Sequence, residues 1–182
     1  GALAVANHVA GFCKDVSVLT CLGDTDRRET LIREKLSPRI QPHFVTHHLA
    51  PTIHKRRFVD QYSGARMFEL YLMEDKPLAG GDEESLLNVL EKTIDPFDVV
   101  IVADYGHGML TEKSIRTLCG RSRFLCVMTQ ANAGNRGFNT ISRYPRADYI
   151  CLALYEIALE ARMRHADWRD LVLNVVKRID CP

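Results

Sequence analysis

The sequence lacks the marks of several protein classes. Its six cysteines form no CxxC pair, which argues against a structural zinc site. No apolar run approaches the ~20 residues that a membrane-spanning helix needs, and the chain does not open on a secretory signal pattern. A net charge of only +1 argues against bulk electrostatic attraction to nucleic acid. We therefore expect a cytoplasmic protein with free thiols and without nucleic-acid or membrane partners.

What is present fits one globular domain with a real core. The 182 residues are 46% hydrophobic and 26% charged, which is ordinary for a folded domain and short for two. The chain opens on Gly1-Ala2-Leu3, already inside a helix-like pattern, so we expect it to have been cut within a domain. We predict a single partial domain over 1–182.

Apolar strand patterns alternate with amphipathic helix patterns along most of the chain. This alternation predicts a three-layer α/β domain with a mainly parallel sheet. The run Val99–Val102 is wholly apolar, which predicts a strand buried on both faces. Strands are predicted at 16–22, 99–102, 124–129 and 149–152, and helices at 2–12, 26–36, 83–93, 112–119, 155–164 and 168–178.

The segment 42–73 differs because it is rich in β-branched and aromatic residues and has no helical period. Strands predicted at 53–62 and 65–73 flank Ser63-Gly64, which is typical of a hairpin turn. We expect this segment to form an appended β lid.

Asp104 and two glycines, Gly106 and Gly108, follow the strand at 99–102, and a helix pattern begins near Thr111. Ligands of open α/β sheets bind beyond the carboxyl ends of strands. Glycines there let the backbone approach a ligand closely, and a helix N-terminus favours an anion. These three residues are therefore candidates for binding a hydroxylated or phosphorylated ligand.

The segment 104–108, DYGHG, resembles the strand-to-helix turn of the ribokinase-like (PfkB) carbohydrate kinases, in particular their heptose-phosphate kinase branch. His107 stands where that branch has a lysine. The resemblance implies a three-layer, ribokinase-like (Rossmann-like) sandwich with a small β lid. It covers the front part of the family's fold only, so we expect a C-terminally incomplete domain.

The start of the chain, GALAVANHVAGF, resembles the family's Gly-Gly-Ala entry, which places backbone and an asparagine against the sugar. Gly1 corresponds to the second glycine of that entry. Ala4 lies about where the asparagine is expected, and the nearest amide is Asn7. The resemblance implies sugar contacts by Gly1 and Asn7; from the residues alone, an ordinary core helix is the alternative.

The stretch 51–58, PTIHKRRF, resembles the Thr-Thr-x-Lys-x-Arg strand of the heptose-phosphate kinase branch. Lys55 and Arg57 share one face of the predicted strand, and Arg56 lies on the other. Two cations on one face suit a sugar phosphate, which an arginine can bind with two parallel hydrogen bonds. The alternative is a charged lid edge that prevents strand-to-strand aggregation.

The loop 130–140 is rich in amides and glycine and follows a predicted strand. It is no Walker A loop, because no Gly-Lys-Ser/Thr closes it. Its strand end reads Met-Thr-Gln where the family has Asp-Pro-Lys. We take Gln130, Asn132 and Arg136 as candidate nucleotide-binding residues; a surface loop held by amide side-chain turns is the alternative.

The segment 150–160 matches the family's Asn-x-x-Glu element, which helps to organise magnesium and phosphate. Tyr155 and Ala158 stand at its two positions, which predicts that the element is lost and that Glu156 and Glu160 are solvated helix residues. The alternative is that Glu156 or Glu160 takes over its role through water. Histidines 43, 47, 48 and 54 are expected at the surface or in packing rather than on a metal ion.

The family's catalytic Gly-Ala-Gly-Asp motif does not occur in these residues. The resemblance therefore implies the sugar- or sugar-phosphate-binding part of an ATP- and magnesium-dependent carbohydrate kinase, inactive alone. The alternative is a non-catalytic module that binds a sugar or nucleotide-sugar, fused to or supporting a nucleotidyltransferase domain. A homodimer through the β lid is a third expectation.

Overall fold

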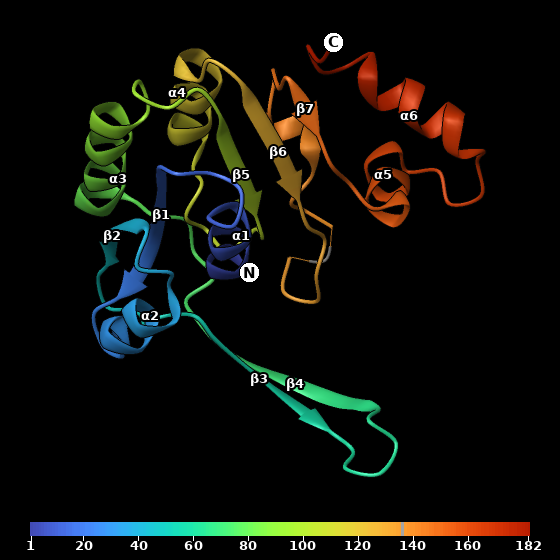
Figure 1. Cartoon of the computed structure of the whole chain (residues 1–182). Helices are drawn as coiled ribbons and strands as arrows, with labels where there is room; N and C mark the ends of the chain where they lie inside the picture. Colours follow the sequence, from blue (N-terminus) through green and yellow to red (C-terminus); the bar gives the residue numbers. More distant parts are fainter. Residues whose placement is uncertain (136) are drawn as a thin grey trace. The chain divides into compact units, whose positions relative to one another are not determined.

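The computed structural model describes residues 1–135 and 137–182. The chain divides into two compact units (Figure 1). We call them the α1–β4 unit, which holds Ala2–Asp75, and the α3–α6 unit, which holds Gly1 and Lys76–Pro182. The predicted single domain over 1–182 stays a prediction.

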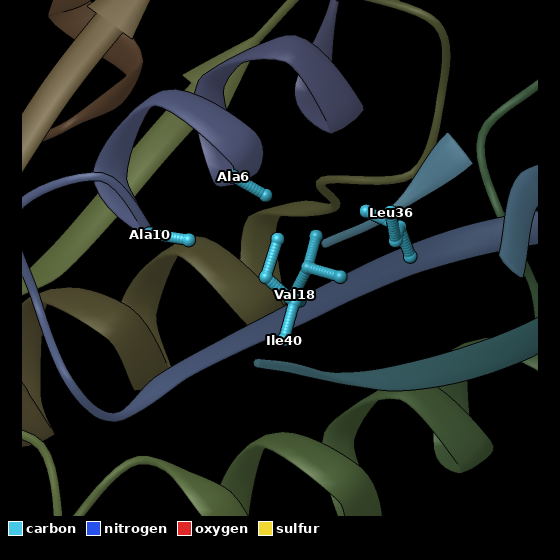
Figure 2. Close-up of a cluster of buried hydrophobic side chains, with 5 residues drawn as sticks. All are labelled: Ala6, Ala10, Val18, Leu36 and Ile40. Atoms are coloured by element: carbon cyan, nitrogen blue, oxygen red, sulfur yellow. The ribbon is translucent and has the colours of Figure 1, made fainter. Parts of the chain in front are cut away.

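Two parallel strands joined by a helix form the body of the α1–β4 unit. Strand β1 (Val16–Gly23) pairs with β2 (Ile40–His47), and α2 (Glu29–Lys35) connects them. Helix α1 (Ala2–Val9) packs against β1. Figure 2 shows the buried side chains at this contact, which form the core of the unit: Ala6, Ala10, Val18, Leu36 and Ile40.

The predicted lid begins later than expected. Residues 42–47 belong to β2, which is parallel to β1, and only β3 (His54–Val59) and β4 (Arg66–Leu72) form the antiparallel hairpin. Composition alone could not separate these segments, because all of them are β-rich. The difference is made by α2, since a helical crossover returns the chain parallel to the strand before it. In Figure 1 the hairpin extends away from β1 and β2.

The α3–α6 unit contains a three-stranded parallel sheet in the order β5-β6-β7. A short 3₁₀ helix at 141–143, η1, precedes the last strand. The bounds are α3 (Gly80–Thr93), β5 (Val100–Asp104), α4 (Glu112–Arg121), β6 (Leu125–Thr129), β7 (Tyr149–Ile150), α5 (Leu154–Ala161) and α6 (Trp168–Val176). These match the predicted elements within a few residues.

The strand at 99–102 is buried on one face only, so the prediction of burial on both faces is wrong. Val102 is 5% exposed, whereas Val99 and Ile101 are 50% and 47% exposed. Successive side chains of a strand point to opposite faces, so Val102 faces the core while Val99 and Ile101 face outward. The apolar run could not reveal this, because its residue types are the same on both faces.

Helix α4 begins directly after the turn that follows β5. The side chain of Thr111 caps it by accepting the N–H of Ser114 at 3.3 Å. Ile115 and Leu118 on its inner side are buried. Among the described residues, no helix has the length and apolar character to cross a membrane.

Candidate functional site

The predicted site residues fall in both units. Asn7, Lys55 and Arg57 belong to the α1–β4 unit. The α3–α6 unit holds the rest that the structure describes: Gly1, Asp104, Gly106, Gly108, Gln130 and Asn132. Arg136 lies outside the described residues.

Asp104 ends strand β5, and its side chain is only 4% exposed. Its carboxylate accepts three hydrogen bonds from the protein. Oδ1 accepts the N–H of Gly106 at 2.9 Å. Oδ2 accepts the hydroxyl of Tyr144 at 2.8 Å and the guanidinium of Arg143 at 3.0 Å. A carboxylate has about four acceptor positions, so the protein itself occupies most of the binding capacity of Asp104.

Sequence reasoning missed Arg143 and Tyr144, which lie about forty residues beyond Asp104 in the chain. Tyr144 is fully buried, and this burial, together with the charge of Asp104, raises the pKa of the Tyr144 hydroxyl far above its usual value. The hydroxyl therefore stays a hydrogen-bond donor. Arg143 also donates to Oδ1 of Asn139 and to the carbonyl of Leu110, both at 2.5 Å. No spacing rule links these positions, so the sequence carried no signal for them.

Amide side chains of the loop 130–140 close over the turn after β5. Asn132 and Asn135 donate to the carbonyl of residue 105 at 2.8 and 3.2 Å, and Asn139 donates to that of residue 104 at 3.0 Å. The Asn132 side-chain oxygen also accepts two backbone N–H groups of its own loop. The amides that made this loop a candidate ligand site are thus used to hold the protein backbone.

Gln130 differs from Asn132 in how it is held. Its described hydrogen bonds run through the backbone: the N–H donates to the carbonyl of Asp104 at 2.9 Å, and the carbonyl accepts Nδ2 of Asn135 at 2.7 Å. Gln130 therefore lies beside the turn after β5, at the carboxyl end of β6. Its position matches the strand ends at which α/β sheets bind ligands.

The two glycines of the turn are required by local packing. Gly106 has φ +67°, and a Cβ there would lie 2.6 Å from Nδ2 of Asn135 and 2.7 Å from Cβ of Asn139. Gly108 has φ +80°, and a Cβ there would lie 2.4 Å from the carbonyl oxygen of Lys76. Both positions combine a left-handed backbone with a close approach that only glycine permits.

Gly1 lies beside this turn, and its contact with the sugar stays a prediction. A Cβ on Gly1 would be 3.6 Å from Cε2 of Tyr105, which is ordinary van der Waals contact. Tyr105 is partly buried, and that burial raises the pKa of its hydroxyl. The α3–α6 unit thus brings together Gly1, Tyr105 and the two glycines of the turn.

Asn7 uses both ends of its amide within the α1–β4 unit. Nδ2 donates to the carbonyl of Lys35 at 2.8 Å, and Oδ1 accepts the N–H of Ser37 at 2.7 Å. These bonds join α1 to the end of α2, where the Lys35 carbonyl has no partner within the helix. Sugar contact by Asn7 stays a prediction, and it would require at least one of these bonds to break.

Lys55 and Arg57 share one face of the hairpin, as predicted, with partners opposite on β4. Arg57 forms an ion pair with Glu69, and Nζ of Lys55 lies 4.8 Å from the centre of the Tyr71 ring. The Tyr71 hydroxyl donates to Glu69 at 2.8 Å. Hydrogen bonds from Tyr71 and Arg57 lower the pKa of Glu69, and partial burial lowers that of Lys55. The face combines two cations, one carboxylate and one aromatic ring.

The described residues do not fit a magnesium site. Both carboxylate oxygens of Glu156 accept backbone N–H groups, of Ala131 at 3.1 Å and of Ala153 at 2.8 Å. Glu160 is buried on α5, where Oε1 lies 3.7 Å from the guanidinium of Arg178; the prediction of a solvated residue there is wrong. Over 1–135 and 137–182 no three His, Cys, Asp or Glu side chains are grouped to hold a metal ion.

Comparisons with known proteins find relatives in sequence and in fold. No protein-family model matches the chain. The bifunctional protein HldE of Nitrobacter winogradskyi is 28% identical over 69% of the chain, and that of Nitratiruptor is 24% identical over 67%. Escherichia coli phosphofructokinase-2, solved in a tetrameric inhibited form, superposes on 98% of the chain with a TM-score of 0.70 at 10% identity.

A pyrophosphate-dependent kinase of the ribokinase family, solved with a pyrophosphate analog and myo-inositol, also covers 98% of the chain, with a TM-score of 0.57 and 14% identity. The chain spans about a quarter of these HldE proteins, 26%, and 58% and 60% of the two solved chains. The predicted ribokinase-like α/β fold is thereby confirmed. The chain resembles the ribokinase-like (PfkB) carbohydrate kinases in fold and is related in sequence to the HldE proteins.

Proposed function

We propose that this chain is the sugar- or sugar-phosphate-binding part of an ATP-dependent carbohydrate kinase, which transfers a phosphoryl group to a sugar hydroxyl. The observation that carries the proposal is the turn 104–108 at the carboxyl end of β5, together with the relation to HldE. This strand end is where open α/β sheets bind ligands, and two glycines with positive φ allow the turn to adopt its conformation there.

Within this proposal, as the resemblance implies, Gly1, Gly106 and Gly108 of the α3–α6 unit supply backbone contacts to a sugar. Lys55 and Arg57 of the α1–β4 unit are proposed to bind a phosphate group. Asp104 acts on the ligand through the turn that it holds, because Gly106, Arg143 and Tyr144 already occupy its carboxylate. Direct contact by the Asp104 carboxylate stays a prediction that would require Arg143 or Tyr144 to move.

Thermal-shift titration with hexose and heptose monophosphates tests the proposal, since a ligand that binds only the folded state raises the Tm. We expect at least one sugar phosphate to raise it. Lys55→Met and Arg57→Met should weaken this effect, whereas Lys14→Met, which removes an exposed lysine of the same unit, should not. The absence of a shift across the panel would refute the proposal.

ATP and Mg²⁺ enter this proposal as substrate and cofactor of the complete kinase reaction. Gln130 is the described loop residue that we propose for nucleotide contact, because its described bonds run through its backbone. We propose that the chain alone has negligible kinase activity, because it contains no Gly-Ala-Gly-Asp segment to stabilise the transferring phosphoryl group and deprotonate the acceptor. Robust ADP formation with any sugar phosphate would overturn this.

A non-catalytic sugar- or nucleotide-sugar-binding module, fused to or supporting a nucleotidyltransferase, is the second candidate. The observation that favours it is that the HldE relatives are bifunctional and the chain spans only about a quarter of them. The two candidates separate in the same titration. Binding of a nucleotide-sugar without binding of the free sugar phosphate would favour the module.

We further propose that the hairpin pairs with that of a second copy. One face of β3 and β4 carries Phe58 stacked on Phe68, with ring centres 4.4 Å apart, and Leu70 and Leu72 are about half exposed. A two-stranded sheet is marginal alone, so this face gains from cover. Analytical ultracentrifugation should show a dimer that Leu70→Glu dissociates. We also propose a reducing, cytoplasmic setting, because several cysteines lie in apolar runs of the sequence, where buried thiols are common.

A further inference from the structure

The turn after β5 is held by one buried ion pair that reaches across three segments. Asp104 lies at the strand end, and the Arg143 guanidinium meets its Oδ2 at 3.0 Å. The same guanidinium donates to Asn139 in the loop and to the carbonyl of Leu110, just before the cap of α4. Arg143 therefore ties the strand end, the amide loop and the start of α4 to one another.

Burial strengthens the electrostatic attraction between Asp104 and Arg143. The Asp104 side chain is 4% exposed and that of Arg143 33% exposed, so solvent screens the pair only partly. A carboxylate in such a place is stable only while charged or polar donors compensate it. Removing Arg143 would leave Asp104 with two donors, one of them the backbone of its own turn.

We propose that Arg143 is a positioning residue, which fixes the turn 104–110 in its ligand-free form so that sugar binding does not have to order it. A loop that is already ordered loses less entropy when a ligand binds, and this preserves affinity. The affinity part of this inference rests on the proposed sugar binding. The ordering part concerns the free protein and stands without it.

The chain offers a matched control in Arg146. This arginine is also partly buried, at 30% exposure, and also pairs with a carboxylate, that of Asp148 at 2.6 Å. Its remaining bonds go to the carbonyls of Cys119 and Ser122, at 2.9 and 3.1 Å. Replacing it removes a comparable ion pair in the same unit without touching the turn 104–110.

The experiment compares Arg143→Met with Arg146→Met by hydrogen–deuterium exchange of the ligand-free protein. We expect both variants to lower the Tm. In Arg143→Met alone, amides of 104–110 and 130–140 should exchange at least about tenfold faster, because charge-assisted hydrogen bonds have been lost. Arg143→Lys should restore part of the protection, since it keeps the charge but not the forked set of donors. Equal exchange of 104–110 in the two methionine variants would overturn the proposal.

A second measurement distinguishes positioning from general stability. With the sugar phosphate that binds the wild-type protein, Arg143→Met should weaken binding at least about tenfold at a temperature where both variants are folded, and Arg146→Met should not. If the wild-type protein binds no sugar phosphate, the proposed function fails, while the exchange contrast still decides whether Arg143 orders the turn. Equal losses of affinity in both variants would reject the positioning role.

Discussion

The turn after β5 and the tip of the β3–β4 hairpin use the same local chemistry in different surroundings. Each centres on an aspartate that accepts three hydrogen bonds from the protein, Asp104 and Asp60. A glycine with positive φ follows in each, Gly106 at +67° and Gly64 at +69°. The side chains of Asn135 and Asn139 pack against Gly106, whereas a Cβ on Gly64 would meet nothing within 4 Å.

The difference shows what a second segment of chain adds to a turn. The side chain of Asp60 accepts from residues close to it in sequence, Tyr62 and Ser63. Asp104 also binds Arg143 and Tyr144, which the fold brings from about forty residues away. Bonds within a turn close a short loop and can also form in part of the unfolded ensemble, whereas bonds across about forty residues depend on the fold and so stabilise it more.

Substitution of the two aspartates should give the largest difference in stability between the two turns. We expect Asp104→Ala to lower the free energy of unfolding by about 3–5 kcal/mol, because Arg143 loses its partner and the Tyr144 hydroxyl is left buried without an acceptor. Asp60→Ala should cost clearly less, since water replaces the lost bonds. Urea denaturation followed by circular dichroism measures both, and equal losses would contradict the contrast.

The two glycines provide the next test. Gly106→Ala should cost about 2–4 kcal/mol, because strain at positive φ adds to the clash with Asn135 and Asn139. Gly64→Ala, which meets open space, should cost about 1 kcal/mol from backbone strain alone. The same denaturation experiment reports both values. If Gly106→Ala is as stable as Gly64→Ala, Asn135 and Asn139 must move aside at little energetic cost.

The residues 99–102, which lead into the turn after β5, show the same contrast between a buried and an exposed side chain. Val102→Thr should destabilise by about 1–2 kcal/mol, because a hydroxyl enters the core without a partner. Val99→Thr, the same substitution at a position that is 50% exposed, should stay within about 0.5 kcal/mol of wild type. Thermal unfolding measures the pair. A large loss at Val99 would show that its face is covered in solution.

Local patterns revealed most of this fold and little of its site. The helix pattern of 112–119, the hairpin signal at Ser63-Gly64 and the strand at 124–129 all depend on neighbouring residues, and each was found. The role of 42–47 was missed because strand pairing depends on a crossover helix rather than on composition. Arg143 and Tyr144 were missed because their partner, Asp104, is close only in the folded chain.

The smallest expected effect is the pH response of the hairpin. Hydrogen bonds from Ser63 hold the pKa of Asp60 below its usual value, and those from Tyr71 and Arg57 do the same for Glu69. Both groups bind protons less readily folded than unfolded, so they stabilise the hairpin above the unfolded-state values near 3.8 and 4.5. That stabilisation should disappear as pH falls through the lower folded-state values. Amide NMR shifts of 58–71, followed downward from pH 6, should report this loss.

Asp60→Asn is the control for this titration, because it keeps an acceptor oxygen at the hairpin tip but cannot take up a proton. The amide shift of Ser63 should move with falling pH in the wild-type protein and stay nearly constant in Asp60→Asn. Movement of the Ser63 amide shift that persists in Asp60→Asn would show that another group titrates at the tip, and that the bonds to the Asp60 carboxylate do not make the hairpin sensitive to pH.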